Sequence, residues 1–256
     1  MTGPVASAHR LLVASQALEE DAPDIGAAAR RHLKVLRPKN GEQVELFDGH
    51  GRWRAFAYEA REGRLVASGG LCSAPPPEAG LSLFACVTKG SRWDWTVEKA
   101  TELGVSRIVP VISGRTIVRI PREERAAKQE RWMRIAEDAA RQSDAKWLPE
   151  ICEAKDFAEA AECARGCAMF VGALVEPPPR DILSAVEGVL SSAGGLPPGG
   201  LGVFIGPEGD FTPSEMESLL GFATPVSLGP SVLRAETAAI YAVSVLAAAL
   251  RAVNRY

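Results

Sequence analysis

Two patterns of hydrophobic positions follow one another along the chain. In the first part, residues 43–47 and 53–58 alternate polar and apolar side chains, and glycine turns follow them at Asp48-Gly49 and Glu62-Gly63. Alternation closed by a tight turn is typical of antiparallel strands. The first part therefore predicts a small antiparallel barrel or sheet, with a helix before it over residues 24–36.

The second part alternates short apolar stretches with longer helical patterns. Strands are expected over residues 81–87, 106–112, 169–175, 201–205 and 225–228. Helices are expected over residues 94–103, 121–142 and 235–253, and another begins at Thr212-Pro213-Ser214-Glu215. A capping box at Ser91 and Asp94 would open the first helix, and Gly104 would close it. This alternation predicts an α/β domain with a mainly parallel sheet covered on both faces.

A proline-rich break separates the two patterns. It runs from Ala74 through Pro75, Pro76 and Pro77 to Gly80. Such a segment is typical of a linker, so we expect one domain over residues 1–74 and a second over residues 80–256. A second loop rich in glycine, serine and proline, residues 191–200, is expected to be a surface connection inside the larger domain.

The composition limits the classes of function. With 46% hydrophobic and 24% charged residues, it is that of an ordinary soluble globular protein. The net charge of −3 argues against a protein that coats nucleic acid over its whole surface. The charge is uneven, because residues 30–39 hold five basic side chains and no acid, whereas residues 147–219 hold 3 basic and 12 acidic ones. One side that faces nucleic acid would explain this, and so would ordinary surface charge.

The cysteines do not form the pattern of a metal site or a disulfide framework. There are five, without a CxxC pair, and the closest two, Cys163 and Cys167, have no histidine nearby. We expect reduced thiols, no metal and a cytoplasmic protein. The N-terminus lacks a signal-peptide pattern, and the longest apolar run, residues 238–250, is shorter than a membrane span, so no membrane association is expected.

The segment Gly206-Pro207-Glu208-Gly209 follows one predicted strand and precedes a capped helix. Ligands of parallel sheets bind at the carboxyl ends of strands, so the position suits a binding loop. The segment is not a phosphate loop, because it lacks GxxxxGK[ST] and Pro207 has no N–H to donate. On these residues alone, a structural turn and a binding loop fit equally well.

Two further segments carry polar residues at strand ends. Leu228-Gly229-Pro230 is a glycine turn before a helix whose first turn contains Glu236 and Thr237. Helix capping explains that pair, but it does not explain Arg234. In the third segment, Lys89 and Arg92 are candidates for contact with a phosphate backbone, and Trp93 and Trp95 for base stacking or for core packing.

Taken together and in this order, the three segments resemble the 16S ribosomal RNA uracil-N3 methyltransferase family, a branch of the knotted SPOUT methyltransferases. The matching features extend over nearly the whole chain. They are Lys89, Arg92, Lys99, Glu102-Leu103-Gly104, Gln142, Pro149-Glu150-Ile151, Gly206-Pro207-Glu208-Gly209-Asp210-Phe211, Leu228-Gly229-Pro230 and Leu233-Arg234-Ala235-Glu236-Thr237-Ala238, with His32-Leu33-Lys34-Val35-Leu36-Arg37, Asn40-Gly41 and Phe47-Asp48-Gly49 in the first part.

The resemblance implies a PUA-like RNA-binding barrel followed by a SPOUT domain with a C-terminal trefoil knot. It also implies a homodimer, which suits the apolar pattern of residues 235–253, and 16S ribosomal RNA of the small subunit as the partner. S-adenosyl-L-methionine would be the cofactor. Its implied binding residues are Leu174, Ile205, Gly206, Pro207, Glu208, Gly209, Leu228, Gly229, Ser231, Leu233, Thr237 and Ala238. The expected RNA contacts are Arg30, Arg31, Lys34, Arg37, Lys89 and Arg92.

The expected reaction is methylation of uracil N3. Because this nitrogen attacks well only as its proton leaves, negative charge develops on O2 and O4, and a cation there would stabilise it. Arg234 is the first catalytic candidate and Arg92 the second. A carboxylate, Glu236, Glu208 or Asp210, would accept the proton, and the sequence does not choose among them.

The chain departs from the family pattern at three positions near these motifs. Asp210 stands where the family usually has glycine, Ser231 where it has arginine, and Ala235 where it has threonine. These departures keep open a non-catalytic RNA-binding or ribosome-assembly protein of the same fold. A knotted enzyme that methylates a ribose hydroxyl or a transfer RNA is a second alternative, and the missing phosphate loops argue against a dehydrogenase.

Overall fold

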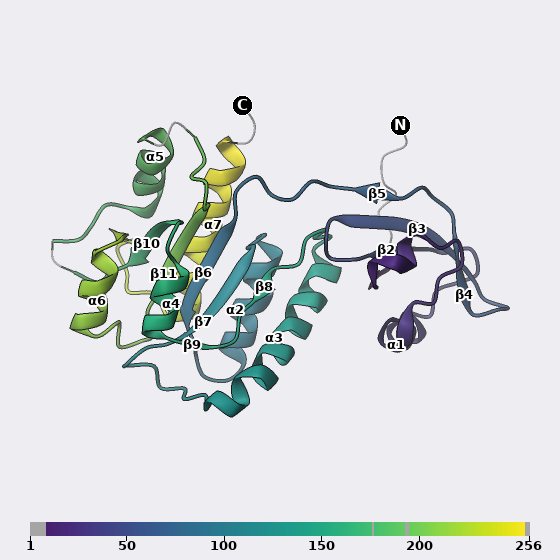
Figure 1. Ribbon diagram of the computed structural model, residues 1–256, viewed down its shortest axis with the longest axis horizontal. Helices are drawn as coiled ribbons and strands as arrows, with labels where there is room; N and C mark the ends of the chain where they lie inside the picture. Colours follow the sequence, from purple (N-terminus) through teal and green to yellow (C-terminus); the bar gives the residue numbers. More distant parts are fainter. Residues whose placement is uncertain (1–8, 176, 193–194, 254–256) are drawn as a thin grey trace. The chain divides into compact units, whose positions relative to one another are not determined.

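The computed structural model describes residues 9–175, 177–192 and 195–253 (Figure 1). The chain divides into two compact units. Unit 1 holds the residues up to Pro76 together with Glu137–Leu148, and unit 2 holds Pro77–Ala136 together with the chain from Pro149 onward. The division lies within the proline-rich segment. The return of Glu137–Leu148 to unit 1 is a feature that the hydrophobic pattern did not indicate.

Unit 1 contains a five-stranded sheet in the order β1-β2-β3-β4, with β5 beside β3. Its elements are β1 (His9–Leu12), the 3-10 helix η1 (Ser15–Leu18), α1 (Gly26–Leu36), β2 (Gln43–Phe47), β3 (Arg52–Glu59), β4 (Arg64–Ala67) and β5 (Cys72–Ser73). β1 and β2 are parallel, whereas the remaining pairs are antiparallel. The predicted helix and both predicted strands are present. Helix α1 contributes Ala29 and Leu33 to the core that Leu46 and Phe56 form on the sheet.

A buried ion cluster ties the segment Glu137–Leu148 to the sheet of unit 1. The Glu45 carboxylate accepts hydrogen bonds from Arg10 Nε and Lys146 Nζ, both at 2.8 Å. The Arg10 guanidinium also donates to the carbonyl of Ala140 at 2.7 Å. Arg10 and Glu45 are each 8% exposed. Because charges buried to this degree need partners, the cluster fixes where this segment lies within unit 1.

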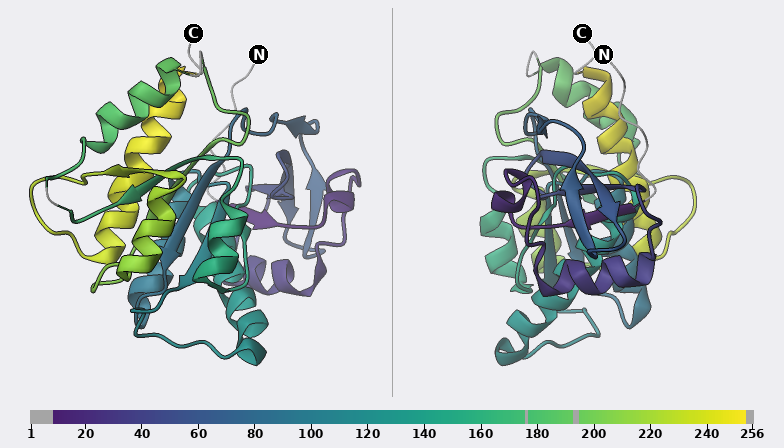
Figure 2. Two further views of the ribbon diagram at one scale, coloured as in Figure 1. Left: turned by 60° about the vertical axis from the view of Figure 1, so that its left-hand side comes forward. Right: turned by 90° about the vertical axis from the view of Figure 1, so that its right-hand side faces the viewer.

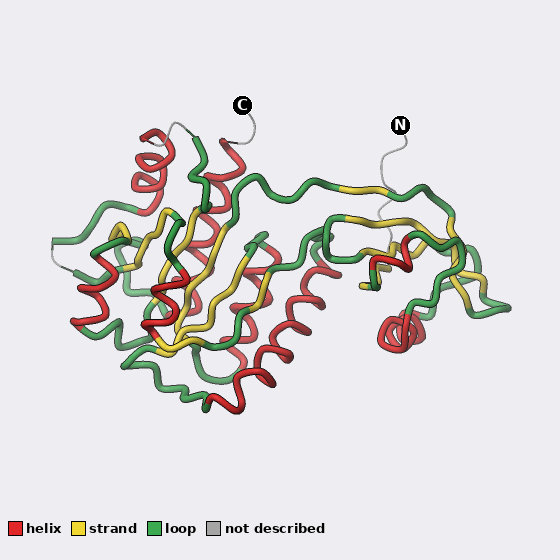
Figure 3. Tube along the Cα trace, in the orientation of Figure 1, coloured by secondary structure: helices red, strands yellow, loops and turns green. Residues whose placement is uncertain are grey.

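Unit 2 is built on a seven-stranded parallel sheet in the order β12-β10-β11-β6-β7-β8, with β9 also pairing with β7 (Figure 3). Its strands are β6 (Leu81–Cys86), β7 (Arg107–Ile112), β8 (Glu150–Ile151), β9 (Lys155–Asp156), β10 (Ala168–Gly172), β11 (Leu201–Ile205) and β12 (Ala223–Val226). Its helices are α2 (Ser91–Glu102), α3 (Arg122–Gln142, which ends in unit 1), α4 (Phe157–Cys163), α5 (Ile182–Ser192), α6 (Pro213–Leu220) and α7 (Ala235–Val253).

Helices cover both faces of this sheet, as the strand–helix alternation predicted (Figure 2). Alternate strand residues point to opposite faces. Leu83 and Val203 pack with α2, α3, α5 and α7, whereas Phe84 and Phe204 pack with α4 and α6. The sheet therefore forms the middle of three layers, and its carboxyl edge carries the loops in which the candidate motifs lie.

Three details of the predicted elements were wrong. The capping box at Ser91 and Asp94 is not formed, because α2 begins at Ser91 with Gly90 as its N-cap, and Asp94 pairs instead with Arg131. The strand predicted over residues 225–228 is β12, Ala223–Val226, and helices α4 and α5 were not predicted. The capping box that Thr212 begins was correct.

Helix α7 is the longest apolar segment among the described residues. By length and composition it would reach across a bilayer. One side of the helix, including Ala238, Ala242 and Leu246, packs into the core of unit 2 against β6, β11, α2 and α5. A core helix of a globular domain accounts for that burial. Tyr241 remains 40% exposed on another side of the helix.

Candidate cofactor and substrate site

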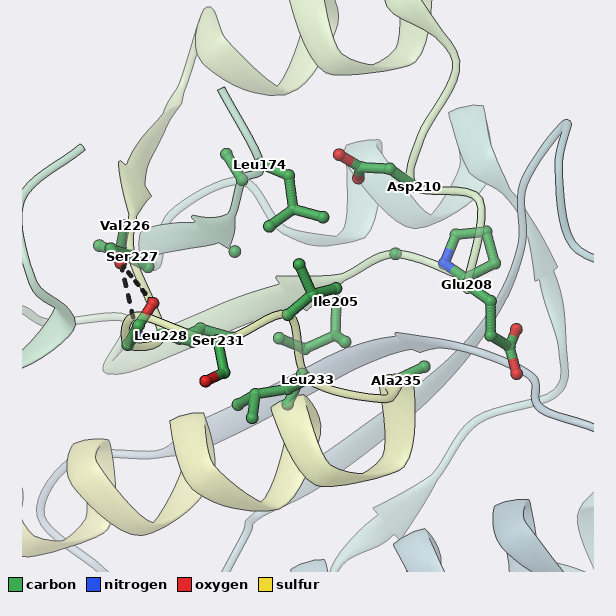
Figure 4. A pocket seen from close by; sticks show the side chains of 17 residues that line it. Leu174, Ile205, Glu208, Asp210, Val226, Ser227, Leu228, Ser231, Leu233 and Ala235 are labelled. Atoms are coloured by element: carbon green, nitrogen blue, oxygen red, sulfur yellow. Dashed lines mark hydrogen bonds between the residues drawn. The ribbon is translucent and has the colours of Figure 1, made fainter. Parts of the chain in front are cut away.

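A cavity lies at the carboxyl ends of β10, β11 and β12 (Figure 4). It encloses about 640 Å³ of space, including the open solvent at its mouth. Three consecutive strand ends and the start of α7 supply the lining. The lining residues are Gly172, Ala173, Leu174, Ile205, Gly206, Pro207, Glu208, Asp210, Val226, Ser227, Leu228, Gly229, Ser231, Val232, Leu233, Ala235 and Ala238. A mainly apolar cavity with a few polar groups, at the carboxyl edge of a parallel sheet, is typical of a small-molecule site.

The loop after β11 forms one side of the cavity, and its first residue, Gly206, lies close to the side chains of Asp210 and Phe211. A Cβ on Gly206 would come within 3.0 Å of Asp210 Oδ1 and 3.3 Å of the Phe211 ring. The loop closes on itself where the Asp210 N–H donates to the carbonyl of Pro207 at 2.8 Å. From the loop after β7, the Arg115 guanidinium donates to the carbonyl of Gly209 at 2.8 Å. These contacts fix the conformation of the loop, which forms part of the cavity wall. From the sequence alone, a simple structural turn was equally compatible.

The loop between β12 and α7 forms the opposite side. Gly229 has a φ of 116°, which only glycine adopts readily. The backbone N–H of Ile182 donates to the carbonyl of Ser227 at 3.1 Å and holds the beginning of the loop. Leu228 and Leu233 pack partly into the core, so their inner surfaces form an apolar wall of the cavity.

The structure brings together ten of the twelve residues that were predicted to bind a cofactor. Gly209 and Thr237 are the two that do not line the cavity. Several lining residues were not predicted. They are Gly172, Ala173, Asp210, Val226, Ser227, Val232 and Ala235. Those from the ends of β10 and β12 carry no chemical signature, and only strand order places them beside the glycine loops.

The catalytic candidates lie around the start of α7 and of α2. Arg92 Nη1 forms an ion pair with Glu208 Oε1 at 3.2 Å, and both side chains are about two-fifths exposed. Arg234 is exposed just before α7, and no ion pair holds it among the residues that the structure describes. Glu236 is 9% exposed, and its Oε2 has no hydrogen-bond partner in the described ranges. Among the described residues, Arg92 is therefore paired, Arg234 forms no ion pair, and Glu236 is a buried carboxylate.

The predicted RNA contacts are exposed. Arg30, Arg31 and Lys34 lie on α1, and Arg37 is its C-cap, all in unit 1. Lys89 is exposed before α2 in unit 2. Trp93, offered as a candidate for base stacking or for packing, is buried and packs edge-on against Trp132 with ring centres 5.6 Å apart. Trp95 is 41% exposed and stays available for a contact with a ligand.

No group of three or more histidine, cysteine, aspartate or glutamate side chains that could hold an ion occurs within residues 9–175, 177–192 and 195–253. The cysteines are free thiols. Burial raises the pKa of Cys86 to about 11, so this thiol is neutral at physiological pH.

Comparison with known proteins gives the same picture from sequence and from structure. The RNA methyltransferase domain family matches residues 75–247, and the RNA methyltransferase PUA domain family matches residues 25–66. Ribosomal RNA small subunit methyltransferase E of Synechocystis is 30% identical over 95% of this chain and 78% of its own length. The Bacillus subtilis protein of the same name is 33% identical over 62% of this chain and 61% of its own length.

Solved structures share the fold over nearly the full length. A methyltransferase from Legionella pneumophila, in complex with bound S-adenosylmethionine, is 28% identical with a TM-score of 0.80, covering 94% of this chain and 97% of its own. Ribosomal RNA small subunit methyltransferase E from Neisseria gonorrhoeae, bound to S-adenosylmethionine, is 26% identical with a TM-score of 0.75, covering 92% and 94%. The two-unit chain, with its cavity between two glycine loops, therefore belongs to the RNA methyltransferase family that includes ribosomal RNA small subunit methyltransferase E.

Proposed function

We propose that this chain transfers the methyl group of S-adenosylmethionine to N3 of a specific uridine in 16S ribosomal RNA of the small subunit. One observation carries the proposal. The two loops that match the family motifs, far apart in sequence, form opposite walls of one cavity at the carboxyl edge of the sheet. Relatives are named ribosomal RNA small subunit methyltransferase E, and a solved neighbour of that name is bound to S-adenosylmethionine.

The lining of the cavity suits S-adenosylmethionine. Leu228, Leu233 and Ile205 offer apolar surface for an adenine ring, and the loop backbones offer the polar groups. When bound, the cofactor supplies a methyl group that is already activated on a sulfonium. The protein therefore has to align the acceptor nitrogen and exclude water.

In this proposal Arg234 stabilises the negative charge that develops on the uracil oxygens as N3 loses its proton. Arg234 is preferred to Arg92 because Glu208 already neutralises Arg92, whereas the Arg234 guanidinium is exposed and unpaired among the residues described. Glu236 is the favoured proton acceptor because its buried Oε2 has a free lone pair. N3 lies on the pairing edge of uracil, so the uridine must be unpaired or flipped out.

Unit 1 is proposed to position the RNA. The exposed basic side chains of α1, Arg30, Arg31 and Lys34, would contact phosphates, which fixes register without reading sequence. The match to a PUA domain over residues 25–66 supports this assignment.

The finer architecture is also part of the proposal. The chain runs from β11 through α6 to β12, on the far side of β10, and then returns to α7, which packs against β6 and β11. This crossing supports the trefoil knot of the SPOUT fold. The exposed side of α7, with Tyr241, supports a homodimer, and we place the protein in the bacterial cytoplasm, where ribosomes are assembled.

Complementation tests the proposed function. Cells that lack their native uracil-N3 methyltransferase would express this chain, the Arg234→Ala variant or the Arg234→Lys variant. We expect 3-methyluridine in digested 16S RNA with the unchanged chain, a loss of at least tenfold with alanine, and partial recovery with lysine, which keeps the charge. Methylation on ribose instead of the base, or in transfer RNA, would contradict the proposal.

A further inference from the structure

We propose that Asp210 is a cofactor-recognition residue of this chain, whose carboxylate holds the sulfonium end of S-adenosylmethionine and so sets the direction in which the cofactor lies in the cavity. The inference rests on the proposed function and goes beyond it. Asp210 is a position where this chain departs from the glycine that the family pattern usually has.

The backbone of Asp210 is the first observation. Its φ is 58°, in the left-handed region that non-glycine residues rarely adopt, although aspartate and asparagine tolerate it better than others. Glycine would satisfy this turn without strain. An aspartate kept in such a conformation beside a cavity suggests that its side chain is used.

The side chain is fixed over the cavity. Asp210 Oδ1 accepts a hydrogen bond from the backbone N–H of Phe211 at 2.7 Å and lies above Gly206, whose missing side chain makes room for it. Figure 4 shows the carboxylate extending toward Leu174, across the cavity, whereas the Glu208 side chain extends away from the other lining residues. One oxygen of Asp210 thus orients the carboxylate and leaves the other for a ligand.

The Arg115 guanidinium donates to the carbonyls of Gly209 and Phe211, on either side of Asp210, but it forms no ion pair with the Asp210 side chain. Glu208, the other acidic residue of the lining, is paired with Arg92 at 3.2 Å. No ion pair involves Asp210 in the part of the chain that the structure describes, and no basic side chain lines the cavity there. A half-buried carboxylate in a mostly apolar cavity favours a cationic partner.

The cavity has two chemically different ends. Ser227, Leu228 and Ser231 lie together at one end, and Glu208 and Asp210 at the other (Figure 4). S-adenosylmethionine is similarly divided, with a neutral adenosine at one end and, at the other, a methionine part that carries the sulfonium together with an ammonium and a carboxylate group. Placing the sulfonium at the acidic end directs the adenosine toward the leucine and serine end. It also brings the methyl group to the side of the cavity where Arg92 contacts Glu208.

A consequence follows for product release. Loss of the methyl group converts the sulfonium to a neutral thioether, so S-adenosylhomocysteine loses its attraction to Asp210 while keeping every other contact. The carboxylate should therefore make this protein prefer the methyl donor to the spent product.

The test is calorimetric binding of S-adenosylmethionine and S-adenosylhomocysteine to the full chain and to Asp210→Asn. Asparagine keeps the size, the tolerance of positive φ and an oxygen for the Phe211 N–H. Asp210→Gly supplies a second, unstrained variant, and Glu217→Gln, an exposed change on α6, controls for net charge.

We expect the Kd of S-adenosylmethionine to rise about fivefold in both Asp210 variants, the size of a partly exposed ion pair, with a change of less than about twofold for S-adenosylhomocysteine and for the control. Equal loss of both ligands would place Asp210 at a group that the two share and overturn the proposal. Unchanged affinities would reduce Asp210 to a turn residue and also overturn it. Because binding needs no RNA, this preference can stand even if no uracil is methylated; a chain that does not bind S-adenosylmethionine would overturn both.

Discussion

Glu45→Gln is expected to release the segment Glu137–Leu148 from the sheet of unit 1. The substitution removes the charge that faces Arg10 and Lys146 but keeps the volume. Breaking a buried ion pair from one side costs about 3–5 kcal/mol. Asp144 lies 2.8 Å from Lys146 and 3.2 Å from Arg10, but its side chain is 72% exposed, so it compensates only in part. We therefore expect a loss of about 2–3 kcal/mol in local stability.

Amide hydrogen exchange measures this loss at the place where it occurs. The Gly51 N–H donates to the carbonyl of Lys146, and the Leu148 N–H donates to the carbonyl of Gly49. Exchange of these two amides should accelerate roughly 30- to 150-fold, since each 1.4 kcal/mol is about tenfold. The control is Glu19→Gln, which breaks an ion pair between Glu19 and Arg52. Because the Glu19 side chain is 64% exposed, this substitution should change the exchange rates little. Equal effects of the two substitutions would refute the buried-cluster argument.

Two further predictions concern unit 2. Thr212→Ala removes the oxygen that accepts from the Glu215 N–H and should lower the free energy of unfolding by about 1 kcal/mol, whereas Thr212→Ser should not; equal losses in denaturant titrations would contradict the cap. The Cys86 thiol should resist a thiol reagent at pH 8 in the folded protein while exposed Cys72 reacts. Burial raises the pKa of Cys86 from 9.0 to about 11, so the neutral thiol favours the folded state. The free energy of unfolding should therefore fall as the pH rises from about 9 to about 11. A free energy of unfolding that stays constant over this range would contradict the prediction.

Local signals explain which parts of the fold were predictable. Strand β2 and helix α7 follow directly from alternation and from a long apolar pattern, and the start of α6 follows from its capping box. In contrast, Ser91 and Asp94 have capping-box spacing, yet the helix begins at Ser91 and Asp94 pairs with Arg131 on another helix. A short-range motif loses to a tertiary contact in that case, which only the folded chain reveals.

Long-range contacts explain what was missed. Glu45 pairs with Arg10, 35 positions before it, and with Lys146, 101 positions after it, and no periodicity marks either pair. Likewise, Gly172 and Val226 line the cavity only because β10 lies beside β11 and β12 lies beside β10. The departures from the family pattern were visible in the sequence, but the positive φ of Asp210 and its position over Gly206 were needed to give one of them a physical meaning.

The most direct test of the account is methyl transfer by the purified protein. Small ribosomal subunits from cells lacking the modification would be incubated with S-adenosylmethionine that carries a labelled methyl group, and the digested RNA would be separated into nucleosides. The account predicts one labelled nucleoside, 3-methyluridine, formed only when the protein is present. Subunits that remain unlabelled, although the protein binds S-adenosylmethionine and a known enzyme of the same family labels the same preparation, would contradict it.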